Sequence, residues 1–164
     1  MEDTPQQYVR DGFSVTTDRA QIELDAALTL LRTTIWGSEL TLAVLERAAA
    51  NSVCFGLHEK TADSETLIGF ARAVSDLATY AYLTDVVIAE SRRGQGLGRW
   101  LIACILAHPD LQNLRRVALL TSDAQMLYTP LGFMIGPGDK TYMEIAGHSE
   151  KEEKKGAASG TPTG

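Results

Sequence analysis

VVIAESRRGQGLGR, residues Val86 to Arg99, is the stretch around which we expect the rest of this chain to be arranged. Its β-branched start, Val86 to Ile88, predicts a buried strand, and apolar residues recur at helical spacing from Leu97 to His108. Between the two lies a turn with glycine at every second position. A glycine-rich turn that opens into a helix leaves backbone N–H groups unpaired at the positive end of the helix dipole. The stretch therefore predicts an anion site, and phosphate is the usual anion there.

Three phosphate-binding patterns can be compared with these glycines. The P-loop requires a lysine after its last glycine, and none follows here. The dinucleotide fingerprint requires a third glycine where this chain has Arg99 or Leu101, depending on the starting glycine. The spacing Arg93-x-x-Gly96-x-Gly98 instead resembles the acyl-CoA pyrophosphate loop of the GNAT superfamily of N-acetyltransferases, written Gln/Arg-x-x-Gly-x-Gly/Ala.

The downstream segment YTPLGF, Tyr128 to Phe133, and the order of the expected elements fit the same family. The resemblance implies an α/β (α+β) GNAT fold: a mixed central sheet of about six to seven strands with flanking helices. Two neighbouring parallel strands of that sheet are expected to splay apart and to hold the cofactor between them.

The resemblance also implies acetyl-CoA as cosubstrate. Its pantetheine amides are expected to pair with the backbone of Val86, Val87 and Ile88. Its pyrophosphate is expected on the N–H groups of the glycine loop, which we define as Arg93, Gly94, Gln95, Gly96, Leu97, Gly98 and Arg99. Glycines suit such a loop because the backbone must approach the phosphates closely and can need a positive φ. Arg93 or Arg92 would add a charge-assisted contact.

Acetyl transfer to an amine has three chemical requirements. The amine must lose a proton before it attacks, the tetrahedral intermediate needs N–H donors near its oxyanion, and the departing thiolate benefits from a proton donor. Tyr128 matches the family tyrosine that supplies this last proton. Asp85 is the carboxylate on the strand that leads into the site and is the candidate base. A structural aspartate bonded to the backbone or to Arg72 is an equal alternative, and water could relay the proton.

The acceptor pocket is expected between the helix–helix loop and the antiparallel strands, at Trp36, Arg72 and Tyr82. Arg72 lies on an otherwise apolar strand face, so it needs a partner: Asp76, Asp85 or an anionic group of the substrate. His58 and His108 are expected at surface or capping positions, and no metal site is expected.

The other elements are expected in the order of this list: a strand at Phe13–Thr17; two helices, the first capped by Asp18 or Asp25 and the second by Ser38; antiparallel strands at Ser52–His58, Leu67–Val74 and Thr79–Ile88; a helix stopped by Pro109; a strand at Val117–Thr121 parallel to Val86–Ile88; a short helix capped by Asp123; and a closing hairpin of Phe133–Ile135 and Tyr142–Ile145. Residues 1–11 are expected to be a flexible lead-in, 12–148 the acetyltransferase domain and 149–164 a disordered tail.

Composition limits the classes of function. The chain has 164 residues, enough for one self-sufficient core, and a net charge of −6, which argues against a nucleic-acid partner. Its two cysteines lack metal-like spacing and are expected to be reduced in a cytoplasmic protein. No signal peptide is visible and no apolar run could span a bilayer, so no membrane partner is expected. The sequence is compatible with a homodimer.

These expectations together favour transfer of the acetyl group from acetyl-CoA to a primary amine of a small molecule or peptide, by direct attack through a tetrahedral intermediate. A catalytically silent acyl-CoA-binding or regulatory domain is the alternative, because no unambiguous base is visible. The identity of the amine is not encoded in any motif of the sequence.

Overall fold

The computed structural model describes residues 4–136 and 141–145. The chain divides into two units, residues 1–133 and 134–164, and all elements named below belong to the first. Among the described residues of the second unit, none lies in a helix or strand, and the Tyr142 hydroxyl donates to a carboxylate oxygen of Glu144 at 3.0 Å. The expected closing hairpin is therefore not formed by its described residues, and its turn lies largely outside them.

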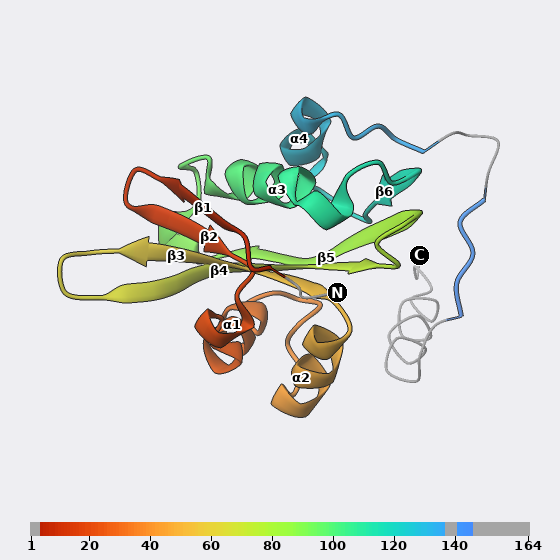
Figure 1. Ribbon diagram of the computed structural model, residues 1–164. Helices are drawn as coiled ribbons and strands as arrows, with labels where there is room; N and C mark the ends of the chain where they lie inside the picture. Colours follow the sequence, from red (N-terminus) through yellow and green to blue (C-terminus); the bar gives the residue numbers. More distant parts are fainter. Residues whose placement is uncertain (1–3, 137–140, 146–164) are drawn as a thin grey trace, which may run out of the picture. The chain divides into compact units, whose positions relative to one another are not determined.

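The first unit is built on one sheet of six strands in the order β1-β2-β3-β4-β5-β6. Neighbouring strands are antiparallel up to β5, and β5 and β6 are parallel (Figure 1). The strands are β1 (Gln7–Arg10), β2 (Phe13–Thr16), β3 (Val53–Lys60), β4 (Glu65–Ser75), β5 (Tyr80–Ile88) and β6 (Arg116–Ala118). This mixed sheet confirms the expected fold class.

Helices cover both faces of the sheet (Figure 1). One face carries α1 (Leu24–Leu31) and α2 (Leu42–Ala50), and the other carries α3 (Leu97–Ala107) and α4 (Gln125–Tyr128). Single 3-10 turns lie at Arg19–Gln21, Glu90–Arg92, Pro109–Leu111 and Thr129–Leu131. Two apolar cores result, one under α1 and α2 and one under α3 and α4.

These two cores explain a difference from the expected pattern of β3. Its alternation predicted a half-buried strand, but Cys54, Phe55, Leu57 and His58 are all buried. Cys54 of β3 joins the core with α1 and α2, while Phe55 and Leu57 join the other. His58 and His108 are both buried rather than at the surface, and the His108 ring accepts from the Asp110 N–H at 3.3 Å, as a cap.

The segment expected as a flexible lead-in contains β1, which pairs with β2. The turn between these strands is Asp11-Gly12, with φ values of 47° and 84°. Asp-Gly between two strand-like runs is a strong signal for a two-residue hairpin turn, because both positions need positive φ. The signal was therefore in the sequence.

Helix caps were predicted less well than helix positions. Thr41, not Ser38, caps α2 by accepting from the Val44 N–H at 3.4 Å. Asp18 caps the 3-10 turn before α1, and α1 itself begins after Glu23. Asp123 does not cap α4, which begins after Ala124 without a side-chain cap. Helix α3 ends at Ala107, before Pro109 as expected.

A strand parallel to β5 is present as predicted, but it spans Arg116–Ala118 rather than Val117–Thr121, and it pairs with the start of β5 rather than with Val86–Ile88. The partners are Tyr80–Tyr82 on β5 and Arg116–Ala118 on β6. From Leu83 to Ile88, the edge of β5 on the β6 side has no strand partner among the described residues. Because strands in a sheet normally satisfy each other's backbone groups, this free edge is available to a ligand.

Candidate active site

The glycine loop follows β5 and opens into α3. Gly94 and Gly96 have φ values of 75° and 76°, and Gly96 is the residue immediately before the helix. A Cβ atom at either glycine would meet no atom within 4 Å, so the space above the loop is open. Left-handed backbone beside open space is what close approach of a ligand to the main chain requires.

Helix α3 begins with unpaired donors. Its first hydrogen bond runs from the Trp100 N–H to the Gly96 carbonyl at 3.0 Å. Within the described residues, the N–H groups of Gly96, Leu97, Gly98 and Arg99 have no acceptor. Four such donors at the positive end of a helix dipole are suited to binding an anion.

Gly98 has a packing role instead of a conformational one. A Cβ atom there would lie 3.7 Å from Ile88 and 3.7 Å from Leu127, which belong to β5 and α4. The beginning of α3, the end of β5 and α4 therefore meet at this residue. This junction brings Tyr128, the neighbour of Leu127, next to the glycine loop.

The two arginines before the loop are used differently. Arg92 donates two hydrogen bonds to one Glu59 carboxylate oxygen, from Nε at 3.0 Å and from Nη2 at 2.8 Å, and this contact raises the pKa of Arg92. Arg93 donates from Nε to the Ile88 carbonyl at 3.1 Å and has no acidic partner among the described residues. Of the two alternatives for a phosphate contact, Arg93 has the guanidinium that no carboxylate occupies.

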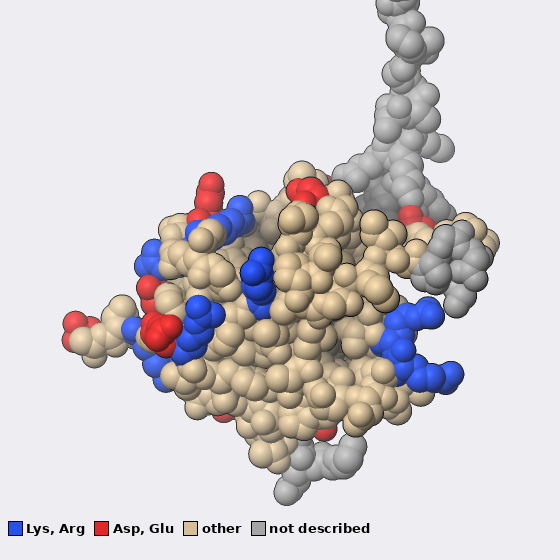
Figure 2. Space-filling view, turned by 90° about the horizontal axis from the view of Figure 1, so that it is seen from above, with Lys and Arg blue, Asp and Glu red and all other residues tan. Residues whose placement is uncertain are grey.

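The positively charged side chains of the described residues do not form one continuous patch on the face that carries α3 (Figure 2). Figure 2 looks down on the face that carries α3 and shows Lys and Arg side chains in separate groups, with uncharged surface between them.

Strand β5 contains a bulge at Asp85. Phe70 pairs with Val87 and Arg72 with Thr84, so β5 has one more residue than β4 over this interval. Asp85 has a φ of 57°, a conformation that costs a non-glycine residue about 1 kcal/mol. Its carboxylate accepts from Arg72 Nε at 2.6 Å, and each side chain is 13% exposed. Arg72 therefore has the aspartate partner that its apolar strand face requires, and Asp76 instead closes the turn after β4.

Tyr128 is buried on the other face of the sheet. Its ring packs edge-on against Phe133, with centroids 5.7 Å apart. Burial raises the pKa of the phenol above its ordinary value of 10.0. The hydroxyl has no hydrogen-bond partner among the described residues, so it can bond to a ligand without breaking a contact of its own.

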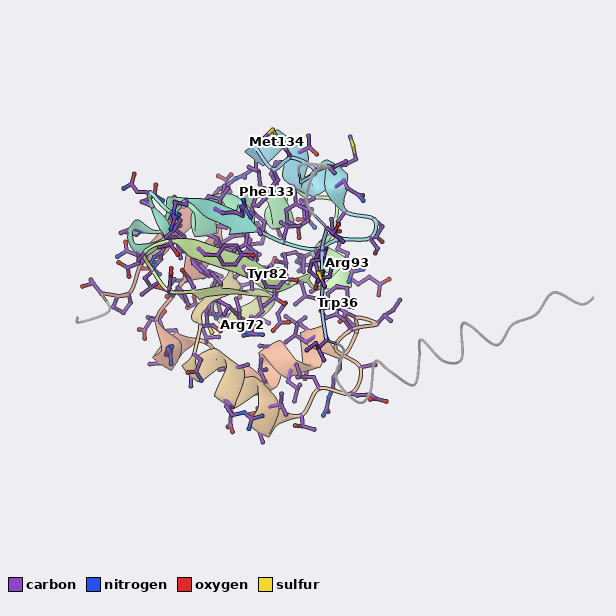
Figure 3. All side chains as sticks on the ribbon, turned by 90° about the vertical axis from the view of Figure 1, so that its right-hand side faces the viewer. Trp36, Arg72, Tyr82, Arg93, Phe133 and Met134 are labelled. Carbon is purple, nitrogen blue, oxygen red and sulfur yellow. The ribbon has the colours of Figure 1, made fainter. Side chains whose placement is uncertain are left out.

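The expected acceptor residues share one side of the sheet. Side chains of paired residues, and of every second residue along a strand, point to the same face. Arg72 and Tyr82 therefore lie on the face of α1 and α2, and Trp36 belongs to the loop between these helices and is 66% exposed. Figure 3 shows Arg72 and Tyr82 beside each other at the sheet, Trp36 on the side of α1 and α2, and Phe133 on the opposite side.

Cysteines and possible metal ligands are the other chemically active groups of the described residues. No three His, Cys, Asp or Glu residues within 4–136 and 141–145 are placed to bind a metal ion together. Both cysteines are free and buried, and burial raises the pKa of Cys54 to about 11 and of Cys104 to about 12, so neither is a reactive thiolate. No helix among the described residues has the length and apolar character to cross a membrane.

One contact at the site was missed at the level of sequence. Arg72 Nη1 donates to the Ser52 hydroxyl at 2.8 Å, so the arginine joins the start of β3 to the bulge in β5. No spacing rule links Ser52, Arg72 and Asp85, because their proximity depends on the strand register.

Comparison with known proteins supports the same conclusion as the geometry. Residues 50–135 match the model of the acetyltransferase (GNAT) domain. A proposed acetyltransferase of Gibberella zeae is 32% identical over 141 residues, covering 76% of this chain and 80% of that protein.

Solved structures show the same fold. A proposed GNAT-family acetyltransferase of Xanthomonas campestris pv. campestris is similar with a TM-score of 0.73 and 37% identity, covering 84% of this chain and 95% of that one. Glucosamine-6-phosphate N-acetyltransferase of Arabidopsis thaliana has a TM-score of 0.58 over 84% of this chain and 99% of its own, and at 16% identity it shows the fold alone.

Proposed function

The chain belongs to the GNAT acetyltransferase family, and from that premise we propose that it transfers the acetyl group of acetyl-CoA to a primary amine. The amine attacks the thioester directly, and the reaction passes through a tetrahedral intermediate. The acceptor is an amine of a small molecule or of a peptide.

The observation that carries the proposal is the continuity of two ligand-binding features along one stretch of chain. The free edge of β5 at Val86 to Ile88 offers backbone groups to the pantetheine amides, and the glycine loop with its unpaired N–H groups follows after the single 3-10 turn at Glu90–Arg92. A ligand with amides at one end and a pyrophosphate at the other matches that order. Acetyl-CoA has this layout, and the Arg93 guanidinium adds a cation near the phosphates.

Tyr128 is the proposed general acid for the departing thiolate. A phenol with the ordinary pKa of 10.0 is already protonated at neutral pH, and burial raises the pKa of Tyr128 further. Its hydroxyl makes no hydrogen bond to another described residue. The packing of Gly98 between Ile88 and Leu127 keeps α4 beside the end of β5, where the thioester would lie. Backbone N–H groups of the free β5 edge would stabilise the oxyanion.

Asp85 is the proposed proton acceptor, directly or through water, from the attacking ammonium group. It lies on the α1 and α2 side of the sheet with Arg72, Tyr82 and Trp36, so the amine would approach from that side. Tyr128 lies on the opposite face, so proton acceptor and proton donor would flank the thioester from two directions.

A catalytically silent acyl-CoA-binding domain is the alternative, and it predicts cofactor binding without turnover. The test is release of free CoA thiol from acetyl-CoA in the presence of a panel of primary amines, with binding measured by calorimetry on the same sample. Binding with amine-dependent thiol release supports the enzyme. Binding without release by any amine supports the silent domain, and no binding at all contradicts both.

A further inference from the structure

Around the bulge, β5 loses regular pairing on both of its edges: the pairing with β6 ends at Tyr82, and the register with β4 shifts between Thr84 and Val87. One extra residue, Asp85, is inserted opposite β4 and takes a left-handed φ of 57°. A bulge bends its strand and re-aims the residues beyond it. Those residues are Val86 to Ile88, whose other edge has no strand partner among the described residues.

A largely buried ion pair holds Asp85 in this conformation. Arg72 Nε donates to one carboxylate oxygen at 2.6 Å, and the Thr84 hydroxyl donates to the other at 3.3 Å. Arg72, on β4, pairs directly with Thr84, on β5. The guanidinium therefore connects the bulge to β4 through a side-chain contact, in addition to the backbone hydrogen bonds of the sheet.

The same guanidinium has a second anchor. Its Nη1 donates to the Ser52 hydroxyl at 2.8 Å, and that hydroxyl donates to the Ala48 carbonyl at 2.8 Å. Ala48 belongs to the last turn of α2. A planar guanidinium can reach two anchors in fixed directions, which a lysine ammonium cannot reproduce.

We propose that Arg72 is a positioning residue that acts through Asp85 to fix the bulge and so to aim the backbone of Val86 to Ile88 at the thioester. The glycine loop holds the phosphates independently of this pair, since Arg93 and the first N–H groups of α3 make no contact with Arg72. Ser52 supports Arg72 from the end of α2. The inference rests on the proposed acetyl transfer and adds to it the residues that set the geometry of that step.

The test compares Arg72→Met with Lys60→Met. Both variants replace a cation of β3 or β4 by an unbranched apolar side chain and remove one ion pair. The Lys60–Glu65 pair is 3.5 Å long, exposed, and at the far end of the β3–β4 hairpin. We measure kcat for thiol release, the acetyl-CoA dissociation constant by calorimetry and the melting temperature for each variant.

We expect Arg72→Met to lower kcat by about 10- to 100-fold, because a displacement of about 1 Å of a reacting group costs rates of this size. Its dissociation constant for acetyl-CoA should stay within about twofold of wild type, because the phosphate contacts are intact. Lys60→Met should match wild type in both. Arg72→Lys should recover part of kcat through the Asp85 contact, and Ser52→Ala should lose less than Arg72→Lys.

Several outcomes would overturn the inference. One is a kcat for Arg72→Met and Arg72→Lys within twofold of wild type at a temperature where both are folded, which would leave Arg72 only a structural role. Another is weakening of acetyl-CoA binding that accounts for the whole loss of activity. If Arg72→Met does not fold, Arg72→Lys takes its place with the same criteria. A wild type that binds acetyl-CoA but acetylates nothing removes the proposed function itself, and this is seen before any variant is compared.

Discussion

The bulge at Asp85 and the glycine loop are separated by the end of β5, Val86–Ile88, and by the 3-10 turn at Glu90–Arg92, and both use left-handed backbone. In the loop, Gly94 and Gly96 adopt it without strain and leave the space above them open. In the bulge, an aspartate adopts it at a cost, and its side chain is paired with Arg72 and largely buried.

The difference teaches how one backbone conformation serves two purposes. Glycine allows a ligand to reach the main chain, so the loop is built for binding. A strained residue with a fixed side-chain partner resists displacement, so the bulge is built for alignment. If this division holds, changes at the loop should alter affinity, and changes at the reacting end of β5 should alter turnover.

The largest expected effect on turnover is at Tyr128, which belongs to α4 beside the end of β5. Tyr128→Phe removes the proposed proton donor and keeps the ring, so kcat should fall by about 10²- to 10⁴-fold while the acetyl-CoA dissociation constant changes little. The melting temperature should change little, since the hydroxyl has no partner among the described residues. Tyr80→Phe, an exposed tyrosine at the start of β5, is the matched control. A Tyr128→Phe enzyme with more than half of wild-type kcat would end the general-acid assignment.

The second prediction tests whether the loop binds the expected ligand at all. Acetyl-CoA at 100 times its dissociation constant should stabilise the fold by about 2.7 kcal/mol, or a melting shift of about 5–10 °C for a chain of this length. NADH and ATP at the same concentration should shift it much less, because their phosphates lack the pantetheine arm that pairs with β5. Equal shifts of the melting temperature with NADH would mean that the loop recognises only the phosphates of a ligand.

The third prediction separates conformational strain from loss of binding. Gly96→Val places a β-branched side chain at a φ of 76°, directly over the space that the phosphates would occupy. We expect acetyl-CoA to bind at least about tenfold more weakly, or ~1.4 kcal/mol. Gly12→Val introduces similar strain in the β1–β2 turn, at a φ of 84°, and should lower the melting temperature without changing affinity. Equal affinity in a folded Gly96→Val protein would mean that the loop does not contact the cofactor.

The smallest expected effect concerns pH. Burial raises the pKa of Tyr128 above 10.0, so the unfolded chain loses this proton at a lower pH than the folded one. The stabilisation is therefore complete below pH 10 and is lost as the pH rises through the folded value. Melting temperatures above pH 10 should fall more steeply for wild type than for Tyr128→Phe, and parallel curves would show that the phenol does not titrate differently on folding.

Local patterns were enough to predict the strand, loop and helix from Val86 to Ala107, because each rests on residues close in sequence. The bulge was out of reach, since it depends on how β5 pairs with β4 rather than on the identity of Asp85. The partner of Arg72 could be narrowed to a few groups by its position on an apolar strand face, but only the register selected Asp85. The roles of Tyr128, Asp85 and the acceptor residues remain predictions.

The short pairing of β6 has a consequence for how the protein moves. Three residues of parallel ladder hold β6 to β5, whereas β4 and β5 pair along most of their lengths. Regions with few backbone hydrogen bonds open at a lower free energy than the centre of a sheet. Amide protons of β6 should therefore exchange with deuterated solvent far sooner than those in the middle of β4. A ligand bound along β5 would slow that exchange. Slower exchange of the Val117 and Ala118 amide protons would therefore be direct evidence of bound cofactor in the absence of turnover.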